Sequence, residues 1–232
     1  KTALYTPSEL YGSVSNIIYT LTELKAAGYT ATDFKNEGFT VQDSKQAGFS
    51  VSQMKTALYT PSELYGSVSN IIYPLPQIKL GGYTATDFKN DNMSIQDIHD
   101  ANFTAAEMKA AGYTPSELYG DTLYTLTELK LGGFTITDFK NDNMTARNAS
   151  DAGFTLAQIR SGGYTIANFQ AGNFTVQDMH DAGFTATQMK AAGYIISELY
   201  GNTLYTYAEI RSGGFTFADF QNDDNISVQD MH

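Results

Sequence analysis

Hydrophobic and polar residues recur in a fixed order every ten positions along this chain. In AAGYTATDFKNEGFTVQDSKQAGFSVSQMK, residues 26–55, an aromatic residue precedes Thr or Ser, an acidic or amide residue follows three positions later, and Lys follows a second apolar residue. With the aromatic residue as the anchor, 22 repeats run from Tyr5 to Ile226, and most anchors are ten residues apart. The pattern predicts a single tandem-repeat solenoid over residues 1–232.

Each repeat carries the signals of a helix start and a helix stop. The Thr or Ser after the anchor and the acidic or amide residue three positions on form a capping box, which Pro74 and Ile195 alone interrupt. The residue before the anchor is Gly in eleven repeats and Asn in five, and both residues suit the left-handed turn that ends a helix. These signals leave room for about two helical turns in each repeat.

Helices this short are not stable alone, because nucleation is unfavourable below roughly 12 residues. The anchor and the residues two and five positions after it are apolar, so neighbouring repeats are predicted to share one core. We therefore expect an all-α solenoid of very short capped helices. The alternative is a right-handed β-solenoid of the pentapeptide-repeat kind, since a hydrophobic residue falls at every fifth position.

A longer repeat overlies the first half of the chain. The stretch KTALYTPSELYGSVSNIIY occurs at residues 1–19 and again at 55–73, which gives a super-repeat of five repeats and 54 residues. The extra residues follow Tyr-Gly pairs, so insertions fall in turns, where a solenoid tolerates them. Neither end of the sequence resembles a polar cap, which predicts a longer array or ends that bind each other.

Composition excludes several classes of function. The net charge of −11 argues against nucleic acid as a partner, and no apolar run is long enough for a membrane span. The chain has no Cys, and its three His all occupy the Lys position of a repeat, so they are interpreted as substituted cations at helix ends. We expect no catalytic site, no cofactor and no metal site, because polar groups are spread evenly along the chain.

Six N-x-S/T sequons are the candidate modification sites. Five of them arise because an Asn in the turn automatically precedes the anchor and the Thr or Ser cap, so a turn role is also a sufficient explanation. The candidates are Asn92, Asn102, Asn143, Asn148, Asn173 and Asn225.

The pattern AGFTxxELKxAG resembles a tandem decapeptide-repeat family found in predicted proteins of microbes and large viruses. The resemblance extends over the whole chain and is close in the runs around Phe103 and Tyr113. It implies repeat architecture and nothing catalytic.

The sequence therefore favours a structural protein that forms an extended fibre or filament, outside the cell or on a cell or particle surface. The expected partners are further copies of the chain, joined end to end, and covalent glycans. The alternative is a solenoid scaffold whose variable exposed positions bind a protein or a glycan.

Overall fold

The computed structural model describes residues 5–13, 16–200 and 204–223, which contain 21 helices of five or six residues each. The predicted all-α solenoid of short capped helices is confirmed, and the alternative β-solenoid is wrong. The local signals for a helix start determine the structure, although a hydrophobic residue falls at every fifth position. One half of each repeat carries the helix start, and the other half carries the turn that ends the helix. The last predicted repeat, anchored at Ile226, lies outside the described residues.

The chain divides into two compact units, Lys1–Tyr113 and Thr114–His232. The helices of the first unit are α1 (Pro7–Tyr11), α2 (Leu21–Ala26), α3 (Ala31–Asn36), α4 (Val41–Gln46), α5 (Val51–Thr56), α6 (Pro61–Tyr65), α7 (Leu75–Leu80), α8 (Ala85–Asn90), α9 (Ile95–Asp100) and α10 (Ala105–Ala110). Those of the second unit are α11 (Pro115–Gly120), α12 (Leu126–Leu131), α13 (Ile136–Asn141), α14 (Ala146–Asp151), α15 (Leu156–Ser161), α16 (Ile166–Ala171), α17 (Val176–Asp181), α18 (Ala186–Ala191), α19 (Ile196–Tyr200), α20 (Tyr207–Ser212) and α21 (Phe217–Gln221).

The predicted capping boxes form at nearly every helix start. In α10, the Thr104 hydroxyl accepts a hydrogen bond from the Glu107 backbone N–H, and the Glu107 carboxylate accepts one from the Thr104 N–H at 2.7 Å. The helix α7 has Pro74 at its N-cap and no side-chain cap, as its sequence requires. At α19, where Ile195 replaces Thr, the Glu198 carboxylate still accepts from the Ile195 N–H at 2.8 Å.

The helix ends also follow the prediction, with two exceptions that carry strain, Leu58 and, just after α11, Thr122, which has φ of 58°. The Gly and Asn residues before the anchors have positive φ, for example 93° at Gly28 and 56° at Asn92. Leu58 occupies the same position with φ of 62° and a side chain that is 79% exposed. A branched side chain is unfavourable in this conformation, so the helix α5 ends at a strained residue.

The core of each unit consists of the predicted apolar positions. The residue five positions after most described anchors is the most completely buried, as Phe34, Phe88, Phe139 and Phe169 show. Ser44 takes this position in α4 and is also fully buried, where its hydroxyl lies 3.1 Å from the Tyr59 hydroxyl. Both polar groups are thus satisfied inside an otherwise apolar core.

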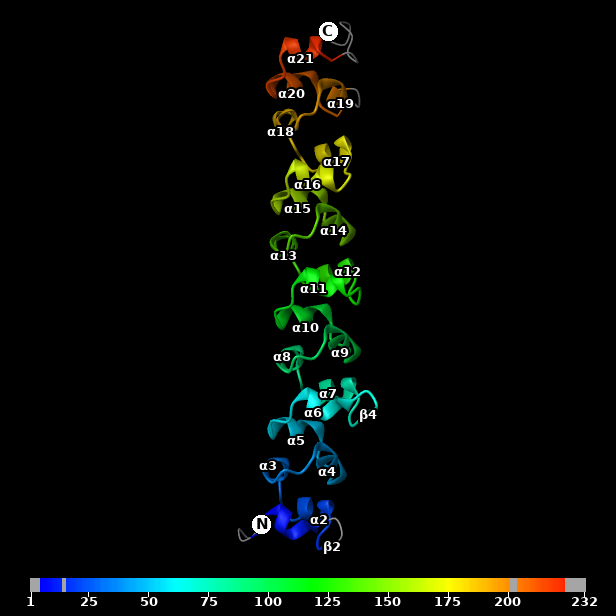
Figure 1. The fold of residues 1–232 in the computed structure, drawn as a ribbon. Coiled ribbons are helices and arrows are strands. Elements are labelled where there is room, and N and C mark those ends of the chain that lie inside the picture. Colours follow the sequence, from blue (N-terminus) through cyan, green and yellow to red (C-terminus); the bar gives the residue numbers. More distant parts are fainter. Residues whose placement is uncertain (1–4, 14–15, 201–203, 224–232) are drawn as a thin grey trace. The chain divides into compact units, whose positions relative to one another are not determined.

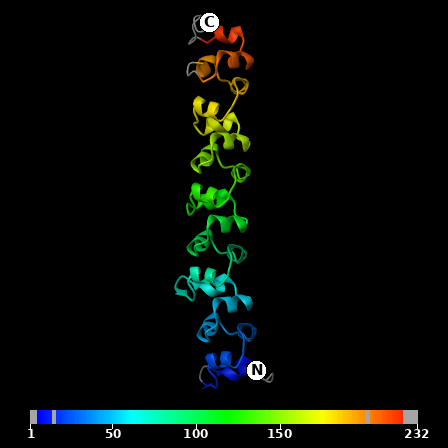
Figure 2. The ribbon, with the colours of Figure 1, turned by 180° about the vertical axis from the view of Figure 1, so that it is seen from behind.

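Apart from α1, α6, α14 and α19, which pack mainly on the next helix, the helices in each unit coil so that most pack on the second helix ahead. The pairs α3 with α5, α8 with α10, α12 with α14, and α18 with α20 are examples. Side-chain contacts, described below, reach the third helix ahead, so one turn of the coil takes between two and three helices. In the first unit α3 and α8 have the same orientation, as do α4 and α9, and in the second unit α13 matches α18 (Figures 1 and 2). The arrangement therefore repeats after five helices, which is the period of the sequence super-repeat.

Two short β-hairpins were not predicted from the sequence. They are formed by β1 (Gly12–Ser13) with β2 (Asn16–Ile17), and by β3 (Gly66–Ser67) with β4 (Asn70–Ile71), both antiparallel. They fall at the two four-residue insertions of the first unit, where the chain leaves α1 and α6. Gly66 has φ of 80°, and a Cβ there would lie 2.6 Å from the Asn70 carbonyl oxygen, so only glycine fits.

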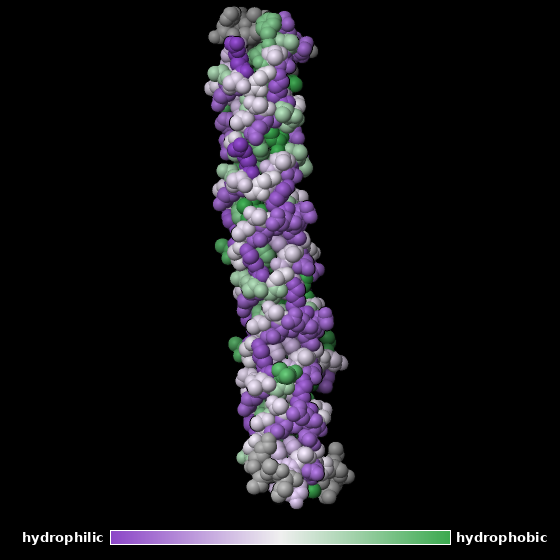
Figure 3. Space-filling model, turned by 90° about the vertical axis from the view of Figure 1, so that its left-hand side faces the viewer, coloured by the Kyte–Doolittle hydropathy of each residue, from purple (hydrophilic) through white to green (hydrophobic). Residues whose placement is uncertain are grey.

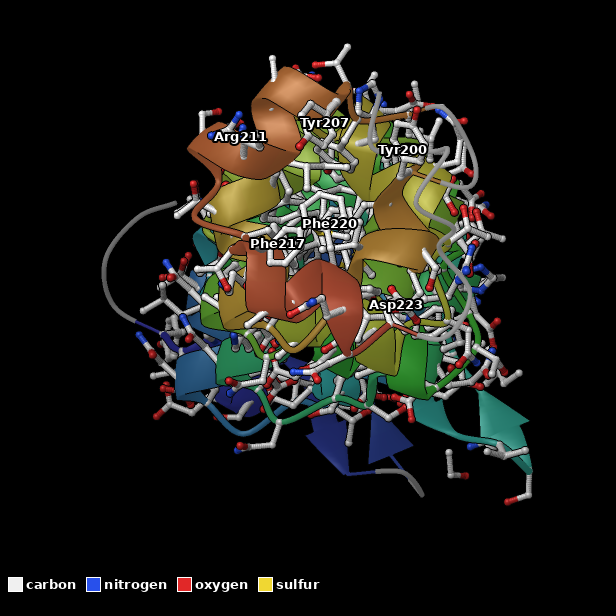
Figure 4. The ribbon with its side chains drawn as sticks, turned by 90° about the horizontal axis from the view of Figure 1, so that it is seen from above. Tyr200, Tyr207, Arg211, Phe217, Phe220 and Asp223 are labelled. Carbon is white, nitrogen blue, oxygen red and sulfur yellow. The ribbon has the colours of Figure 1, made fainter. Side chains whose placement is uncertain are left out.

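Hydrophilic residues cover most of the visible surface of each unit, with isolated apolar residues between them (Figure 3). Among the described residues, the largest exposed apolar side chains are Leu58, Val68, Leu80, Leu131 and Phe217. Phe217 of α21 lies outermost in the view onto the last described helices, while Phe220 lies beneath it in the core (Figure 4). Ile166 and Ala186, the equivalents of Phe217 in earlier repeats, are buried by the helices that follow them.

Candidate functional site

The principal polar feature of the molecule is a contact that joins each repeat to the third repeat ahead. Lys79, in the last turn of α7, lies 4.5 Å from the centre of the Phe103 ring and donates a hydrogen bond of 2.7 Å to the Asn102 carbonyl oxygen. Its ammonium group also lies 2.8 Å from the Glu107 carboxylate at the start of α10. We call this arrangement, a Lys or Arg side chain over the anchor ring three repeats ahead, the cation clamp.

The cation clamp recurs through both units with the same geometry. The complete form, with ring, carbonyl and carboxylate, is made by Lys35, Lys55, Lys79 and Lys190. Where the capping residue is Gln or Asn the carboxylate is missing, and Lys25, Lys130, Lys140 and Arg160 still lie over their rings. The ring is therefore the general part of the clamp, and Lys25 and Lys130 also donate to a backbone carbonyl.

Three repeats keep the contact with the third repeat ahead although the Lys position holds neither Lys nor Arg. Ser150 occupies the Lys position of α14, and Arg147, one turn earlier, makes the clamp by donating to the Gly172 carbonyl at 2.8 Å over the Phe174 ring. Tyr11 and His180 put a ring edge against the anchor instead, with centroid distances of 5.6 Å to Phe39 and 5.0 Å to Tyr205. The contact between repeats three apart is thus retained when its chemistry changes.

Asp87, Glu107 and Asp219, three of the cation-clamp carboxylates, have lowered pKa values. Burial alone would raise the pKa of Glu107, but the hydrogen bonds from Lys79 and Thr104 outweigh it, so the pKa is lowered. The hydrogen bonds from Lys190 and Thr216 lower the pKa of Asp219 to about 2. These groups are stabilised as anions, which makes them structural charges and poor proton donors or acceptors at neutral pH.

A second set of contacts runs backward to the repeat two before. The hydroxyl of Tyr164 donates to the Met144 carbonyl at 2.9 Å, and that of Tyr205 donates to the Phe184 carbonyl at 2.7 Å. Burial raises the pKa of both phenols to about 12. Tyr164 and Tyr205 are therefore core residues whose hydroxyl satisfies a backbone acceptor.

The helices that precede insertions carry a further contact that the sequence analysis missed. The Ser62 N–H at the start of α6 donates to the Asp91 carboxylate at 2.6 Å, and the Ser197 N–H of α19 donates to Asp223 at 2.7 Å. Each carboxylate comes from the end of the second helix ahead. The signal is visible in retrospect, because every Ser-Glu-Leu-Tyr-Gly segment is followed by an acidic residue 26 or 29 positions after its Ser.

The candidate asparagines are distributed along the molecule and are not brought together. Asn92, Asn102, Asn143 and Asn173 are exposed at left-handed turns, with φ between 55° and 63°. At the equivalent turn positions Gly28, Gly82 and Gly133, no atom lies within 4 Å of an added Cβ, so these turns leave room for a bulky group.

The other two sequons differ from these four. Asn148 lies inside α14 and is half-buried, and its side-chain oxygen accepts from the Thr145 N–H at 3.0 Å as part of a capping box. Asn225 lies outside the described residues. Among the candidates that the structure describes, only the four turn asparagines are exposed.

The described part of the chain contains no cluster suited to metal binding. Within residues 5–13, 16–200 and 204–223, no three His, Asp or Glu side chains gather where they could hold a metal ion. His99 and His180 lie in separate units, and His232 is beyond the described residues. Every helix that the structure describes is too short or too polar to cross a membrane.

Comparisons with known proteins give one result, and it agrees with the geometry. A family model described as a decapeptide repeat region matches residues 1–67 and 143–216, which is more than half of the chain. No curated protein and no solved structure matches the chain.

Proposed function

The chain belongs to the decapeptide-repeat family, and we propose that it is a non-catalytic structural element that assembles end to end into a filament. The observation that carries this proposal is the cation clamp. The same contact joins a repeat to the third repeat ahead in both units, with rings, carbonyls and carboxylates supplied by the repeat itself. Because every repeat can make the same contact with a repeat further along, the solenoid can lengthen by adding repeats.

The absence of an alternative use for the polar groups supports the same proposal. In the described residues, the acidic side chains at the helix starts are engaged in capping boxes and cation clamps. The phenols of Tyr164 and Tyr205 are bound to backbone carbonyls. These groups hold repeats together through the contacts that they make.

The exposed turn asparagines support a location outside the cell or on a particle surface. If the chain passes through a glycosylating compartment, Asn92, Asn102, Asn143 and Asn173 offer side chains at open turns on both units. A sugar at these positions would leave the apolar core untouched. We therefore propose that the filament carries glycans at its turns.

Negative-stain electron microscopy of the purified chain tests the filament. The expected result is particles that lengthen as the protein concentration rises, with no added ligand. Single particles of one length at every concentration would refute end-to-end assembly and would favour a scaffold that binds another partner.

Mass spectrometry of native material tests the glycans independently. We expect sugar on the four turn asparagines and none on Asn148, whose side chain is half-buried in a capping box. Unmodified asparagines at all four turns would remove the support for a glycosylated, exported protein.

A further inference from the structure

One groove of the second unit has the parts of a cation clamp but no Lys or Arg at the clamp position. The groove lies between the end of α17, the start of α18 and the helix α20, and its volume is about 390 Å³. Its lining includes the clamp position His180, the anchors Phe184 and Tyr205, and the capping carboxylate of Glu209. A space of this size is within the usual range of small-ligand sites.

The equivalent groove one repeat later shows what this geometry binds. Lys190 takes the position of His180, lies 5.0 Å from the centre of the Phe215 ring and donates a hydrogen bond of 2.6 Å to the Gly214 carbonyl oxygen. The Lys190 ammonium group also lies 2.8 Å from the Asp219 carboxylate. The repeat therefore recognises a primary ammonium group, which here belongs to the chain itself.

The carboxylate of Glu209 has no cation of this kind. It accepts hydrogen bonds from the Thr206 N–H at 2.7 Å and from the Thr206 hydroxyl at 2.8 Å, and these bonds lower the pKa of Glu209. No Lys or Arg within residues 5–13, 16–200 and 204–223 forms an ion pair with it. Glu209 is therefore an exposed anion beside a groove, and His180 rests its ring edge on Tyr205 where a lysine would continue to the carboxylate.

The walls of the groove suit an alkyl chain that ends in an ammonium group. The rings of Phe184 and Tyr205 supply apolar surface, on which the methylene stem of an ammonium ion can lie. The Ser212 hydroxyl, also in the lining, donates to the Glu209 carbonyl oxygen at 3.0 Å, which leaves the lone pairs of its own oxygen for a donor. Carboxylate and hydroxyl oxygens thus accompany the apolar walls.

The charges around the groove favour a cation when His180 is neutral. Asp181 lies beside His180, with 3.5 Å between its carboxylate oxygen and the imidazole Nδ1, and Glu209 lies in the lining. Against these two carboxylates stands the guanidinium group of Arg160, which is 5.1 Å from the centre of the Phe184 ring and is not part of the lining. The local balance is therefore negative, as is the net charge of the chain.

We propose that this groove binds a primary alkylammonium group, in the place that a lysine of the chain itself takes in other repeats. The ammonium group forms an ion pair with Glu209, and the alkyl chain lies along Phe184 and Tyr205. A lysine side chain of another polypeptide and a free alkylamine both carry this chemistry. The proposal does not depend on the filament, because every residue of the groove belongs to one unit of one chain.

NMR titration of the full-length chain with n-butylammonium chloride tests this proposal, with sodium chloride at the same concentrations as the reference for ionic strength. The ring signals of His180 and Tyr205 should shift and saturate, with a dissociation constant of roughly 1–20 mM for a ligand this small. N-acetyl-lysine N-methylamide is the second probe, because it presents the same ammonium group on a peptide unit. Tighter binding of this probe assigns the groove to a polypeptide lysine, and equal or weaker binding assigns it to a free alkylamine; both results support the site.

Two variants remove the site while keeping the fold. Glu209→Gln removes the charge and keeps a side chain that can cap the helix, as Gln188 does for Thr185 in α18. His180→Lys places an ammonium group of the chain itself in the groove. Each variant should weaken the binding of n-butylammonium by roughly fivefold or more, which is the scale of one exposed ion pair.

The matched control is Glu107→Gln, which makes the same change in α10, where Lys79 already pairs with the carboxylate. This control should leave the binding of n-butylammonium unchanged. Shifts that do not saturate by roughly 100 mM, or that sodium chloride reproduces, would overturn the proposal. Equal binding by the wild type and Glu209→Gln would overturn it as well, and circular dichroism checks that every variant is folded.

Discussion

The cation clamp makes a quantitative prediction for Lys79→Met. The substitution keeps most of the apolar stem but removes the ammonium group, which contacts the Asn102 carbonyl, the Phe103 ring and the Glu107 carboxylate. A hydrogen bond of this kind contributes about 1 kcal/mol, an exposed ion pair about 0.5 kcal/mol and a partly exposed cation–π contact about 0.5 kcal/mol. We therefore expect the free energy of unfolding of the first unit to fall by about 2 kcal/mol.

The assay is urea unfolding of the full chain, combined with hydrogen exchange of the peptides that cover α7 and α10. A double-mutant cycle with Glu107→Gln isolates the ion pair, for which we expect a coupling of about 0.5 kcal/mol that salt weakens. Lys25→Met is the matched control, because the corresponding residue in its target repeat is Gln53 and the loss comes only from ring and carbonyl. A loss below about 0.5 kcal/mol for Lys79→Met, which is the range of ordinary surface substitutions, would refute the clamp as a source of stability.

Three further substitutions test other parts of the structure. Leu58→Gly should raise the free energy of unfolding by about 0.5–1 kcal/mol in urea unfolding, because it relieves a branched residue at positive φ; a loss of stability would show that the leucine side chain has a stabilising contact. His180→Lys should raise stability at pH 7 by about 0.5 kcal/mol by restoring a cation over the Tyr205 ring, and no gain by thermal unfolding would contradict the proposed equivalence of positions. The pKa of Asp219, about 2 in the folded chain, should rise toward its ordinary value near 3.8 in Lys190→Met when the carboxyl group is titrated by NMR. Because this folded pKa is depressed, the contribution of Asp219 is present above pH 3.8 and is lost as the pH falls toward 2, and an unchanged titration in Lys190→Met would exclude the ion pair as a cause.

The parts of the fold that depend on neighbouring residues were predictable from the sequence. The sequence predicts the capping box of Thr104 and Glu107 because both residues lie within one helical turn. The burial of Phe34 and its equivalents follows from their spacing from the anchor and the cap. For the same reason the turn role of Asn92 could be assigned from its position before an anchor.

The parts that depend on the coil could not be predicted. The sequence shows Lys79 only as a cation at a helix end. Its partners, 23 and 28 residues ahead, become identifiable only once the number of helices in one turn of the coil is known. The sequence gave no indication that Arg147 forms a cation clamp, because Arg147 lies one helical turn before the Lys position of its repeat. The hairpin β3–β4 was interpreted as a plain insertion, since two-residue strands are too short to show an alternating pattern.

The five-repeat period constrains how such a gene can change in length. A duplication or deletion of five repeats returns each protruding hairpin to its former side, because the coil regains its orientation at that step. Any other number turns the hairpins on one side of the change away from those on the other, even though every capping box survives. Natural length variants that keep their hairpins should therefore differ in steps of five repeats, and the identical stretches at 1–19 and 55–73 supply matching ends for that exchange.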